Sequence, residues 1–334
     1  CERRGIEIRY STQGVNLLQD DSGRVSGLRV LGPEGFEDIA GNSVVLASGG
    51  FEANAEMRCR YIGPGWEMVK VRGVPYNTGD GIRMALDIGA QSHGHWSSCH
   101  AVAWDMNAPA FGDRIITELF QKHSYPFGLI SNINGERFLD EGYDFRNYTY
   151  VTYGRALMTQ PQGLAFQIFD EKVKHLLRDE YWIPQTTMAQ ADTIEELATR
   201  LDIDPEGLAA TIKEYNAAVR TDITYNPTVK DGRCTEGLAV NKTNWAETID
   251  TPPYYGWAVT TGISFTFGGV KINTRGQVVT NSQEPIPGLY AAGEMVGGLF
   301  YYNYPGGSGL SAGMVFGRLS GASAAEDAMK LKDL

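Results

Sequence analysis

Short apolar stretches separated by turn residues dominate the first fifty positions, and this pattern predicts a β-rich start. Residues 5–10 alternate between apolar and polar side chains, and residues 25–30 and 36–39 are two further short strand candidates. Residues 43–47 form a continuous apolar run, which is typical of a strand buried on both faces of its sheet. This run ends in three small residues, Ser48, Gly49 and Gly50.

Helical signals follow in the middle of the chain. Residues 81–90 predict a short helix with one apolar face. Thr193, with a glutamate three residues later, predicts the N-terminus of a second helix. Asp204 before Pro205 predicts a third, which buries a stripe of apolar residues.

A last helix is expected from about Ser308 toward Met329. Four glycines four residues apart lie on one face of it: Gly309, Gly313, Gly317 and Gly321. Because glycine costs up to about 1 kcal/mol in a helix interior, this stripe indicates a closely packed neighbour, expected to be another helix of the same domain. The glycine-rich start of the helix would present free N–H groups to an anionic group, although packing alone also explains the glycines.

The distribution of these elements indicates two domains. A second buried strand at 289–292 ends in Gly293 and Glu294, whereas the region between about 95 and 250 is rich in aromatic residues and loops and then becomes helical. We therefore expect an α/β protein in which one discontinuous domain is interrupted by another. The predicted bounds are 1–95 with 255–334, and 96–254.

Composition narrows the range of functions. The net charge of -11 over 334 residues argues against nucleic acid, which requires a basic surface. No apolar stretch is long enough to span a membrane, and a cytoplasmic location is expected. The four cysteines form no CxxC pair, and the histidines between 93 and 100 have no nearby carboxylate, so no metal site is expected. Because the chain begins with Cys1 and not methionine, we expect it to start within a longer protein.

Both buried strands end in small residues, and this feature suggests a cofactor site. In open α/β sheets, ligands bind at the carboxyl ends of strands, where glycine lets a cofactor approach the backbone. Glu294 can accept a hydrogen bond from a ribose or ribityl hydroxyl. The alternative is two ordinary turns. Asp80 is either a further cofactor contact or a helix cap, and Arg146, between aromatic residues, is either catalytic or a structural stacking partner.

Five segments, taken in order, resemble the flavoproteins related to fumarate reductase and succinate dehydrogenase. These are ASGGF at 47–51, NTGDG at 77–81, NGERFLDEG at 134–142, FTFGGVKIN at 265–273 and IPGLYAAGEMVGG at 286–298. Within that family the chain most resembles the tricarballylate dehydrogenases, in CHAVAWD at 99–105, DEGYDF at 140–145 and IDTPPYYG at 249–256.

The resemblance implies a Rossmann-type FAD-binding domain, discontinuous in this chain, with an inserted α+β capping domain. The substrate would lie between the two domains, over the flavin. The residues that match FAD contacts of the family are Ser48, Gly49, Gly50, Asp80, Glu294, Ser308, Gly309 and Leu310.

The same resemblance implies roles around the substrate. His100 and Thr117 match substrate-binding residues, and Glu118 matches a proton-relay glutamate. Arg146 falls one residue from the position of the acid/base arginine. The implied reaction is α,β-dehydrogenation of a small carboxylic acid, or the reverse reduction of a carbon–carbon double bond, with an electron partner that the sequence does not identify.

Three departures from the family pattern leave alternatives open. The GxGxxG that opens such proteins is absent, so the N-terminal dinucleotide-binding segment is expected to be a missing part of the same protein. Ser264 and Phe265 stand where the reductases have a histidine, and Tyr304 stands where they have an arginine. The tyrosine is also similar to those of the 3-ketosteroid dehydrogenases, in which tyrosines transfer the proton. A non-catalytic fragment that has lost FAD is a further alternative.

The missing segment leads to one structural expectation. We expect the strands at 44–47 and 289–292 to flank an open slot that this segment would fill. An unpaired central edge exposes backbone N–H and C=O groups. On this basis, residues 1–334 alone are not expected to reach the stability of about 5–15 kcal/mol that is usual for folded proteins.

Overall fold

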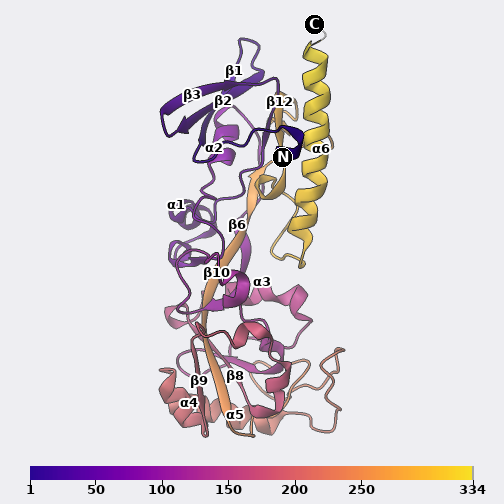
Figure 1. The fold of residues 1–334 in the computed structure, drawn as a ribbon. Helices are drawn as coiled ribbons and strands as arrows, with labels where there is room; N and C mark the ends of the chain where they lie inside the picture. The colour runs from indigo at the N-terminus through magenta and orange to yellow at the C-terminus, as the bar shows by residue number, and fades with distance from the viewer. Residues whose placement is uncertain (333–334) are drawn as a thin grey trace.

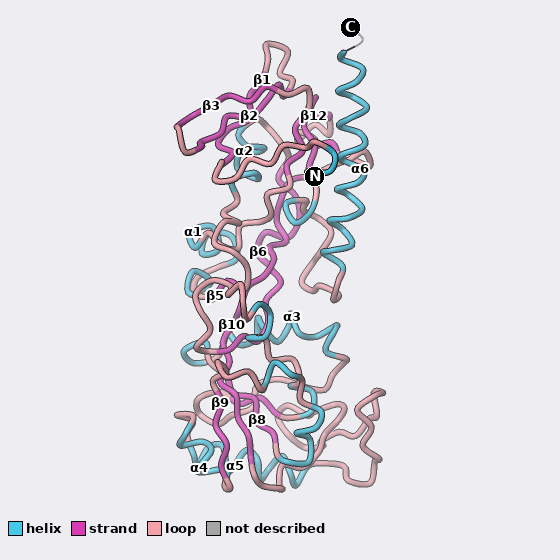
Figure 2. Tube along the Cα trace, in the orientation of Figure 1, coloured by secondary structure: helices cyan, strands magenta, loops and turns pink. Residues whose placement is uncertain are grey.

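The computed structural model describes residues 1–332, and it is elongated (Figure 1). Two long strands, β6 (Ser92–Asp105) and β10 (Tyr254–Val270), pair antiparallel and run along the length of the molecule. Helices and short strands gather around both ends of this pair (Figure 2). The mixture of sheets and helices agrees with the α/β class expected from the sequence.

One end holds two three-stranded sheets. The first is antiparallel, and its strands are β1 (Gln13–Gln19), β2 (Val25–Gly32) and β3 (Gly35–Ala40). The second has the order β11 (Gln277–Val279), β12 (Pro285–Ala291) and β4 (Val44–Leu46). Two helices lie against these sheets, α2 (Asp80–Asp87) and the long α6 (Ser308–Lys332). An apolar core joins α2 to the two sheets, and Ser320 of α6 donates a hydrogen bond of 2.8 Å to the Ala291 carbonyl.

The other end is built on the first half of β10. Its strand partners are β5 (Lys70–Val71), β6, β8 (Ala165–Phe169) and β9 (Met188–Ala191), and β7 (Leu129–Ser131) pairs with β8. The helices are α3 (Arg146–Leu157), α4 (Ile194–Arg200) and α5 (Pro205–Ala218), and the one-turn α1 (Ala55–Met57) lies between the two ends. The largest apolar cluster packs α4 and α5 against this sheet.

Local signals predicted the starts of α4 and α5 correctly. The Thr193 hydroxyl accepts a hydrogen bond of 3.2 Å from the Glu196 N–H. The Asp204 carboxylate accepts one of 3.1 Å from the Glu206 N–H, with Pro205 as the first helical residue. Capping depends only on residues within one turn, which explains why sequence alone was sufficient.

Two strand predictions were wrong. Residues 5–10 form no strand, because no segment within residues 1–332 pairs with them, and Ile6 and Tyr10 are exposed. The strands β4 and β12 do not flank a slot. They pair directly and in parallel, with Leu289 opposite Val44, and β12 is the central strand of its sheet. The edge of β4 that faces away from β12 has no strand partner within residues 1–332.

The glycine face of α6 is open over most of its length. A Cβ atom added at Gly313, Gly317 or Gly321 would meet nothing within 4 Å in the described part of the chain. Only Gly309, at the start of the helix, has close neighbours. The close partner expected along this stripe is therefore not among residues 1–332.

The division into domains stays a prediction. β6 passes without a break through the boundary predicted between residues 95 and 96, and β10 begins at the boundary predicted near 255. These two strands are continuous structural links between the two ends of the molecule.

Candidate active site

A cavity of about 720 Å³ lies where α3, β10 and the start of α6 meet. His100, Glu118, Arg146 and Tyr304, which the sequence placed at the substrate, all line it. Two residues that sequence reasoning did not select, Arg72 and Arg178, also line it, together with Gly306, Gly307 and Gly309 near the start of α6. Their individual roles stay predictions.

The packing of α3 fixes the cavity wall. Gly154 lies so close to β6 that a Cβ atom there would be 2.3 Å from the carbonyl carbon of Ala101. The helix therefore packs directly on the strand, and its first two residues, Arg146 and Asn147, line the cavity. No side chain caps the N-terminus of α3, which begins at Arg146. The positive end of the helix dipole therefore lies beside the cavity without a capping group.

His100 is neutral in this setting. It is 6% exposed, and burial, together with the Arg72 charge, lowers its pKa to about 3. Its Nε2 lies 3.1 Å from the Tyr150 hydroxyl, and its buried Nδ1 has no partner in the described chain. An imidazole in this state offers a hydrogen bond to a substrate and no positive charge.

Tyr304 connects His100 with the start of α6. Its ring packs edge-on against the His100 ring, with centroids 4.5 Å apart. Its hydroxyl accepts a hydrogen bond of 2.8 Å from the Gly309 N–H. The hydroxyl proton is therefore free to point elsewhere, which suits a group that exchanges a proton with a ligand.

Arg146 has no counter-ion. Among residues 1–332, no carboxylate lies within 4 Å of its guanidinium, and no side chain or carbonyl accepts a hydrogen bond from it. Burial is the main factor that lowers the pKa of Arg146, and the nearby charge of Arg178 lowers it further. A positive group held half-buried without compensation favours the binding of an anion at this point.

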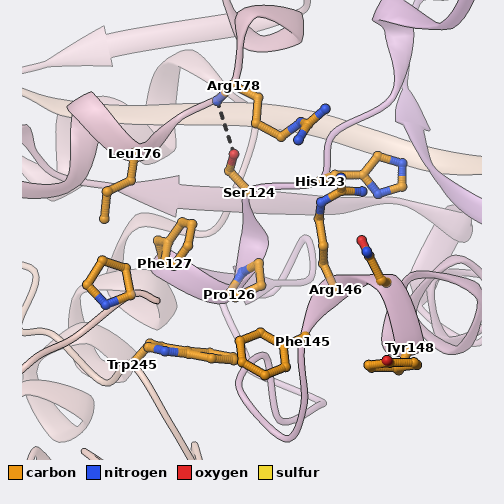
Figure 3. Close-up of a pocket in the computed structure, with 12 residues that line it drawn as sticks. His123, Ser124, Pro126, Phe127, Phe145, Arg146, Tyr148, Leu176, Arg178 and Trp245 are labelled. Carbon is orange, nitrogen blue, oxygen red and sulfur yellow. Dashed lines mark hydrogen bonds between the residues drawn. The ribbon is translucent and has the colours of Figure 1, made fainter. Parts of the chain in front are cut away.

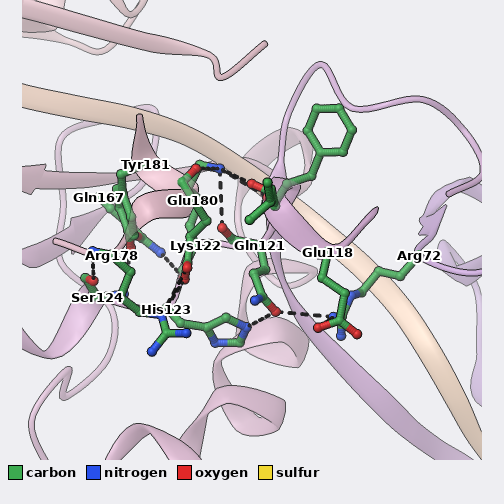
Figure 4. A network of polar contacts seen from close by, with 12 residues as sticks. Arg72, Glu118, Gln121, Lys122, His123, Ser124, Gln167, Arg178, Glu180 and Tyr181 are labelled. Carbon is green, nitrogen blue, oxygen red and sulfur yellow. Dashed lines mark hydrogen bonds and ion pairs between the residues drawn. The ribbon is translucent and has the colours of Figure 1, made fainter. Parts of the chain in front are cut away.

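Arg72, unlike Arg146, has several partners, and Figure 4 shows it beside Glu118 and Gln121. Its Nη1 donates a hydrogen bond of 2.7 Å to the Ser264 hydroxyl, and its Nη2 lies 3.8 Å from the Glu118 carboxylate. The guanidinium also sits over the Trp104 ring, 5.0 Å from its centroid. Glu118 was predicted to relay protons to Arg146, but the basic group it contacts is Arg72.

A series of hydrogen bonds also connects Arg72 through Gln121 with His123, all three of which line the cavity. The Arg72 Nη2 donates a hydrogen bond of 3.3 Å to the Gln121 amide oxygen, which lies 3.0 Å from Nε2 of His123. His123 is buried, and burial lowers its pKa well below the ordinary value. Arg178 pairs with Glu180 at 3.0 Å (Figure 4).

Thr117 is not part of the cavity lining. It is exposed, and its backbone lies in the left-handed region with a φ of 56° at the start of the short turn that carries Glu118. This conformation turns Glu118 toward Arg72 and leaves Thr117 on the surface. The predicted substrate contact of Thr117 is therefore not supported by its position.

The two strand-end motifs from opposite ends of the sequence meet. Because β4 and β12 are parallel, their carboxyl ends share one edge, and Gly50 lies against Glu294 there. A Cβ atom at Gly50 would lie 2.1 Å from Thr266 Oγ1 and 2.2 Å from Glu294 Oε1. The Thr266 N–H donates a hydrogen bond of 2.7 Å to that carboxylate oxygen. Thr266 follows Phe265 on β10, which lines the cavity, so the strand ends and the cavity adjoin.

Glu52 adds a second carboxyl group to this edge, and sequence reasoning missed it. The Asn77 amide donates a hydrogen bond of 2.5 Å to one Glu52 oxygen, and the other oxygen is buried without a partner in the described chain. Burial raises the pKa of Glu52, and burial with the Glu52 charge raises the pKa of Glu294 well above its usual range. The two carboxyl groups thus hold protons more firmly than ordinary ones, and as a pair they can donate as well as accept hydrogen bonds.

The remaining predicted cofactor residues differ in their surroundings. Ser48 packs on Gly81, Gly49 has a φ of 78° beside Asn77, and Asp80 accepts a hydrogen bond of 2.5 Å from the Thr78 hydroxyl. Asp80 is the first residue of α2, and Gly79 is its N-cap. Ser308, Gly309 and Leu310 form the first turn of α6, where Gly309 and Leu310 line the cavity and Leu310 is exposed.

These groups fit one face of a flavin cofactor. The glycines allow close backbone approach, the orphaned Glu52 oxygen and Glu294 can bind hydroxyl groups, and the start of α6 provides N–H groups with a positive dipole end. No helix within residues 1–332 is both long and apolar enough to cross a membrane. In the same described range, no three His, Cys, Asp or Glu side chains gather in a way that could hold a metal ion.

The fold and these glycine-lined strand ends define a flavoprotein, and comparison with known families agrees. The family model for the FAD binding domain matches residues 1–310. The chain belongs to this family, among the flavoproteins related to fumarate reductase, and FAD is its cofactor.

Two curated relatives and one solved structure illustrate the relationship. A fumarate reductase (cytochrome) of Shewanella frigidimarina is 29% identical over 330 residues, which are 98% of this chain and 53% of the relative. A 3-oxosteroid 1-dehydrogenase of Mycobacterium tuberculosis (strain ATCC 25618 / H37Rv) is 29% identical over 361 residues, covering 98% of this chain and 62% of the relative. The open conformation of a flavocytochrome c3 fumarate reductase aligns with a TM-score of 0.75 and 30% identity, covering 98% and 54%. The chain thus spans about half the length of the fumarate reductase it matches.

Proposed function

We propose that the protein containing this chain is an FAD-dependent oxidoreductase that dehydrogenates a carboxylic acid between its α and β carbons, or reduces the corresponding double bond. The observation that carries the proposal is the charge of the cavity. Three arginines, Arg72, Arg146 and Arg178, line it with only one carboxylate, Glu118, in a chain whose net charge is -11. The Arg146 guanidinium has no protein counter-ion within the described residues, and a substrate carboxylate would supply one.

Each side chain has a role derived from its surroundings. Bound FAD would accept or donate the hydride, and this part of the chemistry belongs to the cofactor. Arg146 would bind and polarise the substrate carboxylate, and neutral His100 would hydrogen-bond to it. Arg146 also remains our first candidate for the proton-transfer group. The Glu118 side chain, 75% exposed and next to Arg72, would connect the cavity with solvent.

The identity of the acid is a finer proposal. Three guanidinium groups suit an acid with more than one carboxylate, such as fumarate or tricarballylate, which the sequence resemblance also suggests. One observation favours a second candidate, a reaction like that of the 3-oxosteroid dehydrogenases. The Tyr304 hydroxyl accepts from a backbone N–H and keeps its proton available, and aromatic rings surround it.

Two substitutions distinguish these mechanisms. With fumarate or succinate as substrate, Arg146→Ala should abolish turnover while the protein keeps its flavin absorbance. Tyr304→Phe should then reduce turnover only modestly. If activity persists in Arg146→Ala and is lost in Tyr304→Phe, the tyrosine-based mechanism replaces the first. A wild-type protein without flavin absorbance would instead favour a non-catalytic fragment.

We further propose that a preceding segment of the same protein completes the FAD site. The unpaired edge of β4, the open glycine face of α6 and the exposed side chains of Leu310 and Met314 support this proposal. Residues 1–334 expressed alone should be insoluble or should melt without cooperativity. A soluble monomer with a cooperative transition would contradict the proposal.

A further inference from the structure

A second cavity adjoins the first and differs from it in chemistry. It has a volume of about 510 Å³, and four residues of its wall, His123, Arg146, Asn147 and Arg178, also belong to the wall of the first cavity. We call it the side chamber. Beyond those shared residues its wall is mainly apolar: Ser124 and Tyr148 bring hydroxyl groups, and the rest is Pro126, Phe127, Phe145, Leu176, Pro227 and Trp245.

The side chamber is polarised from one end to the other (Figure 3). Arg146, Arg178 and His123 lie together on one side of the space, and Phe145, Trp245, Phe127 and Leu176 lie around the other. The Phe145 and Trp245 rings are tilted against each other with centroids 5.5 Å apart. A ligand anchored to Arg146 by a carboxylate would therefore have apolar surface within reach on the side away from the first cavity.

The far wall is rigidly built. The Trp245 indole is 1% exposed, and its Nε1 donates a hydrogen bond of 2.7 Å to the Val229 carbonyl. Its backbone adopts a φ of 55°, a conformation that bulky residues rarely occupy, and the Asp231 carboxylate holds it by accepting from the Trp245 N–H at 2.9 Å. Such strain is maintained only where the surroundings fix it, and it clusters at functional sites.

We infer that the side chamber binds an apolar substituent of the substrate, so that the acid carries an aryl or alkyl group in addition to its carboxylate. This inference rests on the proposed function and deepens it. The carboxylate would lie at the junction beside Arg146, the carbons that react would lie in the first cavity, and the apolar group would contact Phe145 and Trp245. A wall of aromatic rings and prolines gives such a group more favourable surroundings than water does.

Matched acids test the inference by isothermal titration of the flavin-containing protein. The pairs are propanoate with 2-phenylpropanoate, and succinate with phenylsuccinate; in each pair a phenyl ring replaces one hydrogen on the carbon next to a carboxylate. We expect the phenyl acid of at least one pair to bind about tenfold or more tightly than its partner, because a buried ring gains apolar contact. Phe145→Ala should reduce this ratio, and Leu176→Trp, which fills the side chamber, should remove it.

An aromatic residue elsewhere provides the matched control. Phe36 is 69% exposed on β3, at the other end of the molecule, and Phe36→Ala should leave the affinity ratio unchanged. If the wild-type protein binds both members of each pair equally, the inference is wrong while the carboxylate site stands. The inference is also wrong if the affinity ratio persists in Phe145→Ala. This substitution is the milder of the two, because the Phe145 side chain is half-exposed, so the test does not depend on whether Leu176→Trp folds. If no acid binds at all, the proposed function fails as well.

Discussion

The missing counter-ion of Arg146 makes a quantitative prediction about the substitution Arg146→Met. Because the guanidinium has no protein partner within residues 1–332 and is repelled by Arg178, the folded state gains little from its charge. The free energy of unfolding should therefore stay within about 1 kcal/mol of the wild-type value or rise. Binding of succinate should weaken by about tenfold to a hundredfold, because hydrogen bonds to charged groups contribute about 1.5–3 kcal/mol each.

Arg137→Met is the matched control, since the residue change is the same but Arg137 has a buried carboxylate as its counter-ion. Arg137 and Glu141 are 6% and 0% exposed, and they form a salt bridge of 2.5 Å. Removing the guanidinium would leave the Glu141 carboxylate buried without a counter-ion, with the Ile130 N–H as its remaining hydrogen-bond donor among the described residues, and breaking such a pair costs about 3–5 kcal/mol. Arg137 does not line the candidate active site, so any loss of affinity there should follow only from unfolding.

Urea unfolding of the complete, flavin-containing protein, followed by circular dichroism, would give the two free energies, and titration calorimetry at fixed salt would give the succinate affinity. The two variants should separate cleanly: Arg146→Met loses binding and keeps stability, whereas Arg137→Met loses stability. A destabilisation of Arg146→Met comparable to that of Arg137→Met would show that Arg146 has a structural partner. An unchanged succinate affinity would remove Arg146 from the binding site.

Three further predictions concern other parts of the site. Burial lowers the folded-state pKa of His100 from 6.5 to about 3, so the unfolded chain binds more protons between these two pH values. The free energy of unfolding should therefore fall as the pH drops through this window, by up to about 1.4 kcal/mol per pH unit. His100→Gln should flatten the dependence of the urea midpoint on pH. Gly50→Ala should lower both flavin content and melting temperature, because the added methyl group would lie 2.1 Å from the Thr266 hydroxyl. Gly306→Ala should be tolerated, because the nearest atom, the Tyr150 hydroxyl oxygen, would be 3.9 Å away. Equal flavin absorbance in the two variants would contradict the close approach at Gly50. Cys99 is fully buried with a raised pKa and should resist thiol reagents in the folded protein, and rapid labelling detected by mass spectrometry would show that this region opens.

Signals that depend on neighbouring residues were readable from the sequence. Thr193 and Asp204 cap their helices as predicted, because a cap involves residues within a single turn. The apolar runs at 43–47 and 289–292 did become strands, β4 and β12, with glycine soon after their carboxyl ends. Burial on both faces was wrong for β4, because Val45 is 40% exposed within the described chain. The alternation at residues 5–10 failed as a predictor because a strand also requires a partner, and period alone cannot supply one.

The candidate site was only partly predictable for a related reason. His100, Glu118, Arg146 and Tyr304 were found through family motifs, but Arg72 and Arg178 lie in no such motif. Arg72 reaches the cavity because β5 pairs with β10, which places it beside Ser264, a residue 192 positions away in sequence. Glu52 was likewise missed, because it directly follows the segment at 47–51, which was selected for its small residues.

The sequence by itself determined several of the strands and helices, the residues at which α4 and α5 begin, and the small residues that follow β4 and β12. The tertiary structure decided that β4 and β12 are direct neighbours, that Glu118 contacts Arg72 and not Arg146, and that an apolar chamber lies behind the arginines. The physical reason is that periodicity and capping are local, whereas the identity of a site depends on the register in which distant strands pair along β10.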